Sequence, residues 1–377
     1  MNFTIGPDDM EAIALGGAFL GTGGGGDPYI GKLMARSMMA AEGVAVQVVD
    51  AAEVPDDALC VPVCMMGAPT VMVEKLPNGE EALAALRALE SYLGQKADYL
   101  ICIEAGGLNS TIPFAVSAAT GLPLIDGDGM GRAFPELQMV SLTLHDIAAT
   151  PMVIADDKGN SGVLNAISNR WTERLARSVT VEMGGAALVA LYPMTGAQMK
   201  KGLLHGTLSL VHEVGRTIIA ERKENRHPAA ALIKRCNGFE LCTARVVDIE
   251  RRTTGGFARG KAILRGLDRD HGREFALSFQ NEFLCLEDGE GNPLALTPDL
   301  ICALDADGGL PVTTESLRFG LALQLIGLPA DPQWRSPGGL ELAGPGYFGY
   351  AHPFKPLEEL ANQRTPQTKA LNLEMNQ

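Results

Sequence analysis

Short apolar runs that alternate with helical patterns dominate the first half of the chain and restrict its fold. Mostly apolar runs predict strands at 44–49, 59–66, 97–103, 122–125 and 141–144. Leucine or alanine at helical spacing occupies two of the intervals, at 78–94 and 111–120. Strands that alternate with helices are typical of a parallel sheet covered on both faces. The pattern predicts an N-terminal α/β domain at 1–167, a mostly parallel α/β/α sandwich.

The second half of the chain has a different periodicity. Long helices rich in leucine, isoleucine and alanine are predicted within 195–235. Beyond residue 240, apolar and polar residues alternate in short segments that are separated by glycine and aspartate turns, a pattern typical of a barrel or sandwich. We therefore expect a C-terminal domain at 168–356, β-rich at 240–350, followed by a polar tail at 357–377.

Charged and amide side chains follow two of the predicted parallel strands. The strand at 97–103 is followed by Glu104 and Asn109, and the strand at 122–125 by Asp126, Asp128 and Arg132. In open α/β sheets, ligands bind beyond the carboxyl ends of the strands. We therefore expect these five side chains to line one pocket.

A glycine-rich segment, GTGGGGDPY at 21–29, interrupts two predicted helices. It lies before a helix N-terminus, where backbone N–H groups can hold an anion, so Gly24, Gly25 and Asp27 are predicted to bind substrate. A dinucleotide fingerprint would follow a strand and a phosphate loop would carry a lysine; neither is present, so no nucleotide is expected. Glu74 and Lys75, which follow another strand, are candidates for the same pocket.

The overall charge and the cysteine pattern restrict the binding partners and the cellular compartment that we expect. A formal net charge of −14 with no basic run argues against binding of nucleic acid. Seven cysteines without a CxxC pair are typical of reduced thiols, and acidic residues near residue 10 occur where a secretion signal would carry bases. With no long apolar span, we expect a cytoplasmic protein that binds a small molecule, not a membrane, and that forms a homo-oligomer.

Several long and unusual strings together resemble one family. They are GTGGGGDPY at 21–29, MGAPTVMVEK at 66–75, EAGGLNS at 104–110, DGDGMGRAFPELQM at 126–139, DDKGN at 156–160, GTLS at 206–209 and GPGYFGY at 344–350. The chain resembles the two-domain family named for S-methyl thiohydantoin desulfurase. The resemblance implies an α/β domain, a β-rich second domain and, for some members, hydrolytic desulfuration of a thiohydantoin ring, often beside hydantoinase-type enzymes.

The chemistry of such a reaction suggests roles for the strand-end residues. Replacement of ring sulfur by water needs an activated water, a group that stabilises negative charge and an acid for the departing sulfur. We assign Asp126 or Asp128 as general base or metal ligand, Glu104 as the second carboxylate, Arg132 as the anion clamp and Asn109 as an orienting donor.

Alternatives to this mechanism stay open at the level of sequence. Zinc could activate the water, with His145 beside Asp126 and Asp128 as ligands. A cysteine nucleophile, Cys64 or Cys102, is another route. The competing class is a non-catalytic protein that binds or senses a hydantoin-like ligand without turning it over.

A further pattern is a stripe of basic residues. Arg170, Arg174 and Arg177 recur at helical spacing within a predicted amphipathic helix at 165–177. Such a stripe is usually a solvated helix face, and we predict that here.

Overall fold

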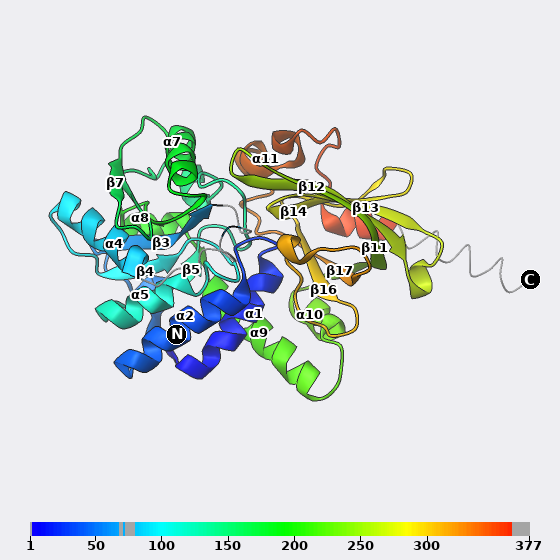
Figure 1. Cartoon of the computed structure of the whole chain (residues 1–377), viewed down its shortest axis with the longest axis horizontal. Coiled ribbons are helices and arrows are strands. Elements are labelled where there is room, and N and C mark those ends of the chain that lie inside the picture. Colours follow the sequence, from blue (N-terminus) through cyan, green and yellow to red (C-terminus); the bar gives the residue numbers. More distant parts are fainter. Residues whose placement is uncertain (1, 68–70, 72–79, 364–377) are drawn as a thin grey trace, which may run out of the picture.

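The computed structural model describes residues 2–67, 71 and 80–363 and forms two lobes that lie side by side (Figure 1). Within those residues, one lobe contains a ten-stranded mixed sheet and the other a seven-stranded antiparallel sheet. The predicted combination of an α/β part and a β-rich part is confirmed. Among the described residues, no helix has the length and apolar character needed to cross a bilayer.

The first sheet is built around four adjacent parallel strands in the order β2, β5, β4 and β3. Antiparallel strands extend it on both sides, so the predicted parallel arrangement holds for its centre. The strands are β1 (Phe3–Ile5), β2 (Val46–Val49), β3 (Leu59–Gly67), β4 (Tyr99–Cys102), β5 (Leu124–Asp128), β6 (Met152–Ala155), β7 (Ser161–Leu164), β8 (Ala186–Ala190), β9 (Met194–Thr195) and β10 (Leu204–His205). Apart from its two ends, every residue of β3 is buried, as expected of a strand covered on both faces.

Helices pack against this sheet and against one another. Helix α5 contacts β3 and β4, α7 contacts β6 and β8, and α1 lies along α9. The α-helices are α1 (Met10–Leu20), α2 (Pro28–Glu42), α4 (Glu80–Leu93), α5 (Ile112–Thr120), α6 (Ser141–Leu144), α7 (Asn169–Glu182), α8 (Gly196–Gly202), α9 (Thr207–Lys223), α10 (Ala229–Arg235) and α11 (Pro337–Ala343). The 3-10 helices are η1 (Pro7–Asp9), η2 (Ala51–Glu53), η3 (Asp268–Asp270), η4 (Thr314–Ser316) and η5 (Pro345–Phe348).

The segment at 141–144 is the short helix α6, so its prediction as a strand was wrong. Four residues are too few to distinguish a buried strand from a single buried helical turn by apolar content. Ser141 and Leu142 are both buried here, although alternate residues of a half-buried strand would point to opposite faces.

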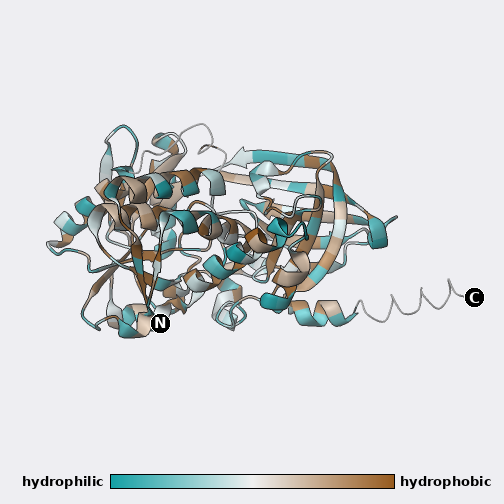
Figure 2. Ribbon diagram, turned by 90° about the horizontal axis from the view of Figure 1, so that it is seen from below, coloured by the Kyte–Doolittle hydropathy of each residue, from teal (hydrophilic) through white to brown (hydrophobic). Residues whose placement is uncertain are grey.

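The second sheet is a single curled antiparallel sheet in the order β15, β14, β13, β12, β11, β17 and β16. The curl brings β14 against β16, so the sheet forms a half-barrel, and Figure 2 shows its bend from below. Its strands are β11 (Phe239–Thr254), β12 (Phe257–Gly266), β13 (Glu274–Gln280), β14 (Glu282–Asp288), β15 (Pro293–Leu296), β16 (Leu300–Asp305) and β17 (Ala322–Leu328).

The chain returns to the first sheet after residue 168. Strand β8 lies between β3 and β6, and β9 and β10 pair with β3 and β5. The domain boundary that we predicted at 167/168 is a division of the sequence, and it stays a prediction.

The glycine-rich segment after α1 joins the two lobes. The Phe283 N–H donates to the Thr22 carbonyl at 2.7 Å, and the Thr314 N–H donates to the Gly23 carbonyl at 2.8 Å. Gly23 has φ +87°, and a Cβ there would lie 2.6 Å from the Phe283 ring. Only glycine fits this contact, which fixes the start of β14 against the loop.

Candidate active site

A cavity of about 70 Å³ lies where the glycine-rich segment meets both lobes, or about 590 Å³ with the space at its open mouth. Its lining comes from the ends of β3 and β4, the loop after β5, helix α7 and the start of β14. The lining residues are Gly25, Gly26, Cys64, Met65, Met66, Gly67, Ile103, Glu104, Asn109, Met130, Phe134, Pro135, Glu136, Leu137, Arg177, Val189, Leu191, Asn281 and Glu282.

Glu104 is the carboxyl group that β4 places in this cavity. Its side chain is buried, and burial raises its pKa from 4.5 to about 8, outweighing the hydrogen bond that it accepts from Asn109. At neutral pH most of the Glu104 carboxyl therefore carries a proton.

Asn109 ties Glu104 to the end of β3. Its amide nitrogen donates to Glu104 Oε1 at 2.6 Å and to the Met65 carbonyl at 3.3 Å, and its amide oxygen accepts from the Met65 N–H at 2.8 Å. Three bonds fix the orientation of both polar side chains. Two of the five strand-end side chains that we expected in one pocket, Glu104 and Asn109, thus line this cavity.

Glu282 is a second buried carboxyl group in the cavity, at the first position of β14 in the other lobe. Its Oε2 atom is buried without a hydrogen-bond partner in the described part of the chain. Burial first, and then the negative charge of Glu104, raise the pKa of Glu282 well above its usual value. A buried carboxyl oxygen without a partner is costly, so its persistence suggests a functional role.

The glycine-rich loop contacts both carboxyl groups. A Cβ on Gly24 would lie 2.0 Å from Glu282 Oε1, and a Cβ on Gly25 would lie 3.4 Å from Glu104 Oε1. Consecutive residues of one loop therefore contact the two acids. Gly24 packs on Glu282 but is not among the cavity-lining residues, whereas Gly25 is.

Two backbone N–H groups of this loop have no hydrogen-bond acceptor among the described residues. They belong to Gly25 and Gly26, with φ values of +75° and +84°, and both residues line the cavity. Unpaired N–H groups beside a cavity can stabilise negative charge that develops on a bound ligand. Asp27 does not line the cavity; it caps α2 by accepting from the Tyr29 and Ile30 N–H groups.

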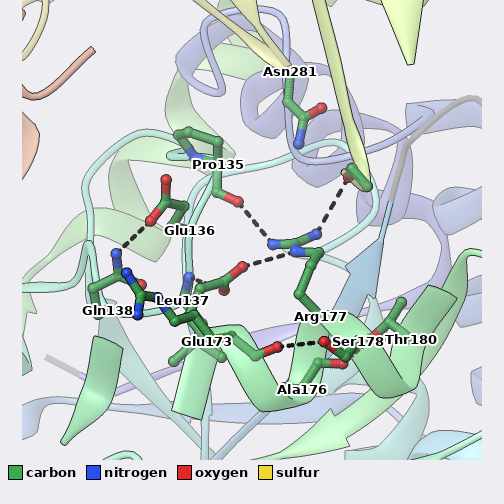
Figure 3. Close-up of polar contacts among 12 residues, drawn as sticks. Pro135, Glu136, Leu137, Gln138, Glu173, Ala176, Arg177, Ser178, Thr180 and Asn281 are labelled. Carbon is green, nitrogen blue, oxygen red and sulfur yellow. Dashed lines mark hydrogen bonds and ion pairs between the residues drawn. The ribbon is translucent and has the colours of Figure 1, made fainter. Parts of the chain in front are cut away.

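Arg177 of α7 lies at the cavity wall with its guanidinium held on several sides (Figure 3). Its Nε donates to Glu173 Oε1 at 2.7 Å, and its terminal nitrogens donate to the Pro135 carbonyl at 3.0 Å and the Gly256 carbonyl at 3.5 Å. The residue is only 9% exposed. The prediction of a fully solvated arginine stripe was therefore wrong for Arg177, because α7 turns this position toward β12.

Asp126 and Asp128 do not line the cavity, so the expected convergence of five side chains is met in part only. Asp126 accepts from the Ser209 N–H at 2.9 Å and from the Ser209 hydroxyl at 2.5 Å, which holds the first turn of α9. Asp128 accepts from the Met130 N–H at 2.7 Å and the Gly131 N–H at 2.5 Å. Burial raises the pKa of Asp128 to about 6.

Arg132 also lies away from the cavity lining and is fully buried between the lobes. Its Nε donates to the Ala133 carbonyl. Its terminal nitrogens donate to the carbonyls of Pro298, Asp299 and Phe283 and to the Thr22 hydroxyl. All five N–H groups of the guanidinium thus have partners within the protein, and none is left to clamp a substrate.

The remaining candidates occupy different places. His145 is exposed and pairs with Gln333 at 3.0 Å, and the residues that the structure describes contain no group of three or more His, Cys, Asp or Glu side chains suited to a metal. The donors predicted for zinc therefore do not meet, and we derive no step through a metal. Glu74 and Lys75 lie outside the described residues.

Cys64 lines the cavity, whereas Cys102 does not. Burial raises the pKa of both thiols, and for Cys64 the Glu104 charge adds to the effect. A nucleophilic cysteine needs a lowered thiol pKa, so this environment does not activate Cys64. No disulfide joins any two of the seven cysteines.

Glu282 and Arg177 are the cavity residues that the sequence prediction did not identify as functional. Arg177 belonged to the stripe with Arg170 and Arg174, but the stripe alone does not tell which member faces the protein. Glu282 lies 178 positions after Glu104, in a segment with ordinary strand alternation, and carries no local signal. Only the packing of the half-barrel against the glycine-rich loop brings it to the cavity.

Family models match the chain in two consecutive parts: the S-Me-THD-like N-terminal domain at residues 8–166 and the S-Me-THD-like C-terminal domain at 167–357. A crystal structure of a protein from Chromobacterium violaceum is similar, with a TM-score of 0.74 and 27% sequence identity over 94% of this chain and 100% of that chain. A comparison with curated proteins found no match. The similarity extends over both lobes.

Proposed function

The chain belongs to the S-Me-THD-like family, and on this premise we propose that it removes sulfur from a thiohydantoin ring by adding water at ring carbon C2. One observation carries the proposal: the buried carboxyl groups Glu104 and Glu282 line one cavity and lie next to consecutive glycines of one loop. Two carboxyl groups that differ in proton affinity can supply the base and the acid that hydrolysis needs.

The two acids take different roles because the charge on one affects the other. Burial raises the pKa of both carboxyl groups, to about 8 for Glu104, and once Glu104 is ionised its negative charge raises the pKa of Glu282 further. Glu104 is therefore the base that accepts a proton from water. Glu282 keeps its proton and is the acid for the departing sulfur.

The bond changes balance for an S-methyl thiohydantoin. The water oxygen bonds to C2 while Glu104 takes one water proton and passes it to the ring nitrogen of the former C2=N bond. The C2–S bond then breaks, and the departing methanethiolate takes the Glu282 proton. The hydroxyl on C2 returns a proton to Glu282 and becomes the carbonyl. The products are a hydantoin and methanethiol, and both side chains recover their starting state.

The glycine loop supports this chemistry through its backbone. Negative charge develops on the ring during attack at C2, and the unpaired N–H groups of Gly25 and Gly26 are suited to accept it as hydrogen-bond donors. Asn109 holds Glu104 through its 2.6 Å bond and so orients the base. A fixed base and fixed donors reduce the reorganisation that the reaction requires.

Incubation of the full chain with a 5-substituted S-methyl thiohydantoin tests the proposal. We expect release of methanethiol, measured with a thiol reagent, together with an equal amount of hydantoin, and ¹⁸O from labelled water at the C2 carbonyl. Glu104→Gln and Glu282→Gln are each expected to lower kcat by about 10²–10⁴-fold while the circular dichroism spectrum is unchanged.

Two further measurements separate the alternatives. If the protein only binds a hydantoin-like ligand, calorimetry will show binding while no thiol appears. If Cys64 is the nucleophile, Cys64→Ala will abolish turnover; we expect it to lower kcat by less than about tenfold, as for a packing change near the site. Full activity in Glu104→Gln would end the assignment of the base.

The pH dependence of kcat/KM is a third test. Since Glu104 must be ionised to accept a proton, the rate is expected to rise between pH 6 and pH 9 with an apparent pKa of about 8. The Glu104→Gln variant lacks this group, so its residual rate will not show the same rise. A rate that is constant over this range in the unmodified protein would contradict the role of Glu104.

A further inference from the structure

A surface groove continues from the mouth of the cavity. It has a volume of about 780 Å³, and its lining residues are Glu136, Arg170, Glu173, Arg174, Arg177, Ser178, Phe257 and Tyr347. Glu136 and Arg177 line both the cavity and the groove. A substituent on a ring bound between the two acids would therefore extend past Arg177 into this groove.

The Arg177 guanidinium has N–H groups that no acceptor among the described residues uses. It carries five N–H groups, and three are used by Glu173, Pro135 and Gly256. Two N–H groups of a residue that is 9% exposed thus have no acceptor among the described residues. Buried donors without acceptors are unfavourable, so this site is suited to a ligand that brings acceptor oxygens.

The guanidinium is also held in place before any ligand arrives. Its carbon lies 4.3 Å from the centroid of the Phe257 ring, and a Cβ on Gly256 would lie 2.7 Å from Arg177 Cδ. Contacts from α7, from the loop after β5 and from the start of β12 leave little freedom for rotation (Figure 3). A fixed guanidinium can hold a carboxylate with two parallel bonds at low entropic cost.

Charge around the groove favours an anion. The groove is lined by three arginines, Arg170, Arg174 and Arg177, and by two glutamates, Glu136 and Glu173. Its formal net charge is therefore +1. Arg170 and Arg174 have no ion-pair partner in the part of the chain that the structure describes. A positive groove is unusual for a chain with a formal net charge of −14.

We propose that the natural substrate carries a carboxylate on the ring substituent, as in a thiohydantoin built on an acidic amino acid, and that Arg177 binds this carboxylate. The inference rests on the proposed function, since it assumes that the ring occupies the cavity between Glu104 and Glu282. Arg177 is thus a specificity-determining residue that contacts the substituent and not the reacting carbon.

Binding of two reaction products by calorimetry tests the proposal. The ligands are hydantoins with a carboxyethyl or a carbamoylethyl group at C5, which have nearly the same shape and differ in charge. We expect the full chain to bind the carboxylate at least about tenfold more tightly. Arg177→Gln is expected to remove this preference, and Arg177→Lys is expected to keep part of it because the charge remains.

Two other arginines provide comparisons. Arg174→Gln, on the exposed side of the same helix, is expected to reduce the preference by less than about threefold, since a solvated charge acts weakly. Arg216→Gln removes an exposed charge from α9 and should leave the preference unchanged. Equal affinity of the unmodified protein for the two ligands would overturn the proposal, and so would a preference that survives in Arg177→Gln. If Arg177→Gln does not fold, the affinities of the unmodified protein and of Arg177→Lys for the two ligands test the proposal.

Turnover separates this inference from the proposed function. If the preference for the carboxylate is found but neither S-methyl thiohydantoin counterpart releases methanethiol, then the anion site stands and the desulfuration proposal fails. If both counterparts react with equal kcat/KM and the products bind equally, then desulfuration stands and the role of Arg177 fails.

Discussion

Two buried arginines, Arg132 and Arg177, lie in different regions of the molecule and differ in how many of their N–H groups donate to protein oxygens. Arg132 lies between the lobes with no exposed surface, and each of its five N–H groups donates to a protein oxygen. Arg177 lies at the cavity wall and uses only three of its five. The first arginine completes the protein's own structure, and the second leaves capacity for a ligand.

The comparison extends to the carboxyl groups. Asp126 and Asp128, near Arg132 in sequence, accept hydrogen bonds from the nearby chain and lie outside the cavity lining. Glu282, in the cavity with Arg177, keeps one oxygen unpaired among the described residues. Groups suited to chemistry are those with donors or acceptors that lack a protein partner, whereas groups that hold the fold have such partners. This distinction is clearer than one based on charge alone.

The largest expected effect is on stability. Arg132→Met would leave four carbonyl oxygens and a hydroxyl without their donor, and we expect a loss of about 3–5 kcal/mol in the free energy of unfolding. Denaturant unfolding followed by circular dichroism measures this value.

Arg177→Met is the matched variant for Arg132→Met. It loses three hydrogen bonds, one of them an ion pair with the buried Glu173 carboxyl, which keeps its bond from the Leu137 N–H, so we expect a cost of about 1–3 kcal/mol. If Arg177→Met proves as destabilising as Arg132→Met, the distinction between a structural and a ligand-binding arginine fails.

The sequence allowed prediction of the sheet but of only part of the site. Apolar runs reveal strands that are buried on both faces, and strand ends reveal Glu104 and Asn109, because parallel strands end at the same edge. The same rule failed for Asp126 and Asp128 because β10 and the start of α9, more than 70 residues away, cover the end of β5.

Long-range packing explains the remaining differences. Arg132 was predicted as an anion clamp from its place among glycines, yet three of its five hydrogen bonds go to carbonyls of the other lobe, at Pro298, Asp299 and Phe283. Glu282 reaches the cavity only through the half-barrel. No local pattern encodes which lobe will cover a polar side chain, so these roles required the structure.

The second prediction concerns the pH dependence of stability and the contribution that Glu104 makes to it. In the unfolded chain this carboxyl ionises near 4.5, whereas the folded protein holds its proton until about 8. Between these values the folded state binds more protons than the unfolded state, so stability falls as pH rises, by up to ~1.4 kcal/mol per pH unit from this group.

Glu104→Gln supplies the control for this slope. A glutamine does not titrate, so the variant should lose stability less steeply than the unmodified protein between pH 5 and pH 8. Denaturant midpoints measured at several pH values provide the comparison. Identical slopes in the two proteins would mean that Glu104 is not buried as a neutral acid.

The third prediction concerns Asp126 as a structural acceptor. Removal of its bonds to Ser209 in Asp126→Ala is expected to cost about 1 kcal/mol, the usual value for a lost helix cap. Ser209→Ala removes one of the same bonds, and in a double variant the two costs should be less than additive. A loss of turnover in Asp126→Ala beyond about tenfold, with stability unchanged, would instead support the catalytic role that the sequence suggested.

The smallest effect is expected for Asp128→Asn. The asparagine oxygen can accept the same bonds from the Met130 and Gly131 N–H groups, and the shape of the side chain is nearly unchanged. Because Asp128 lies outside the cavity lining, we expect kcat to change by less than about threefold and stability by less than ~1 kcal/mol. A fall in kcat of a hundredfold or more in a folded variant would show that Asp128 takes part in the reaction. In that case a carboxylate outside the cavity lining would be functional, and the contrast between the Arg132 and Arg177 regions could no longer be used to locate the active site.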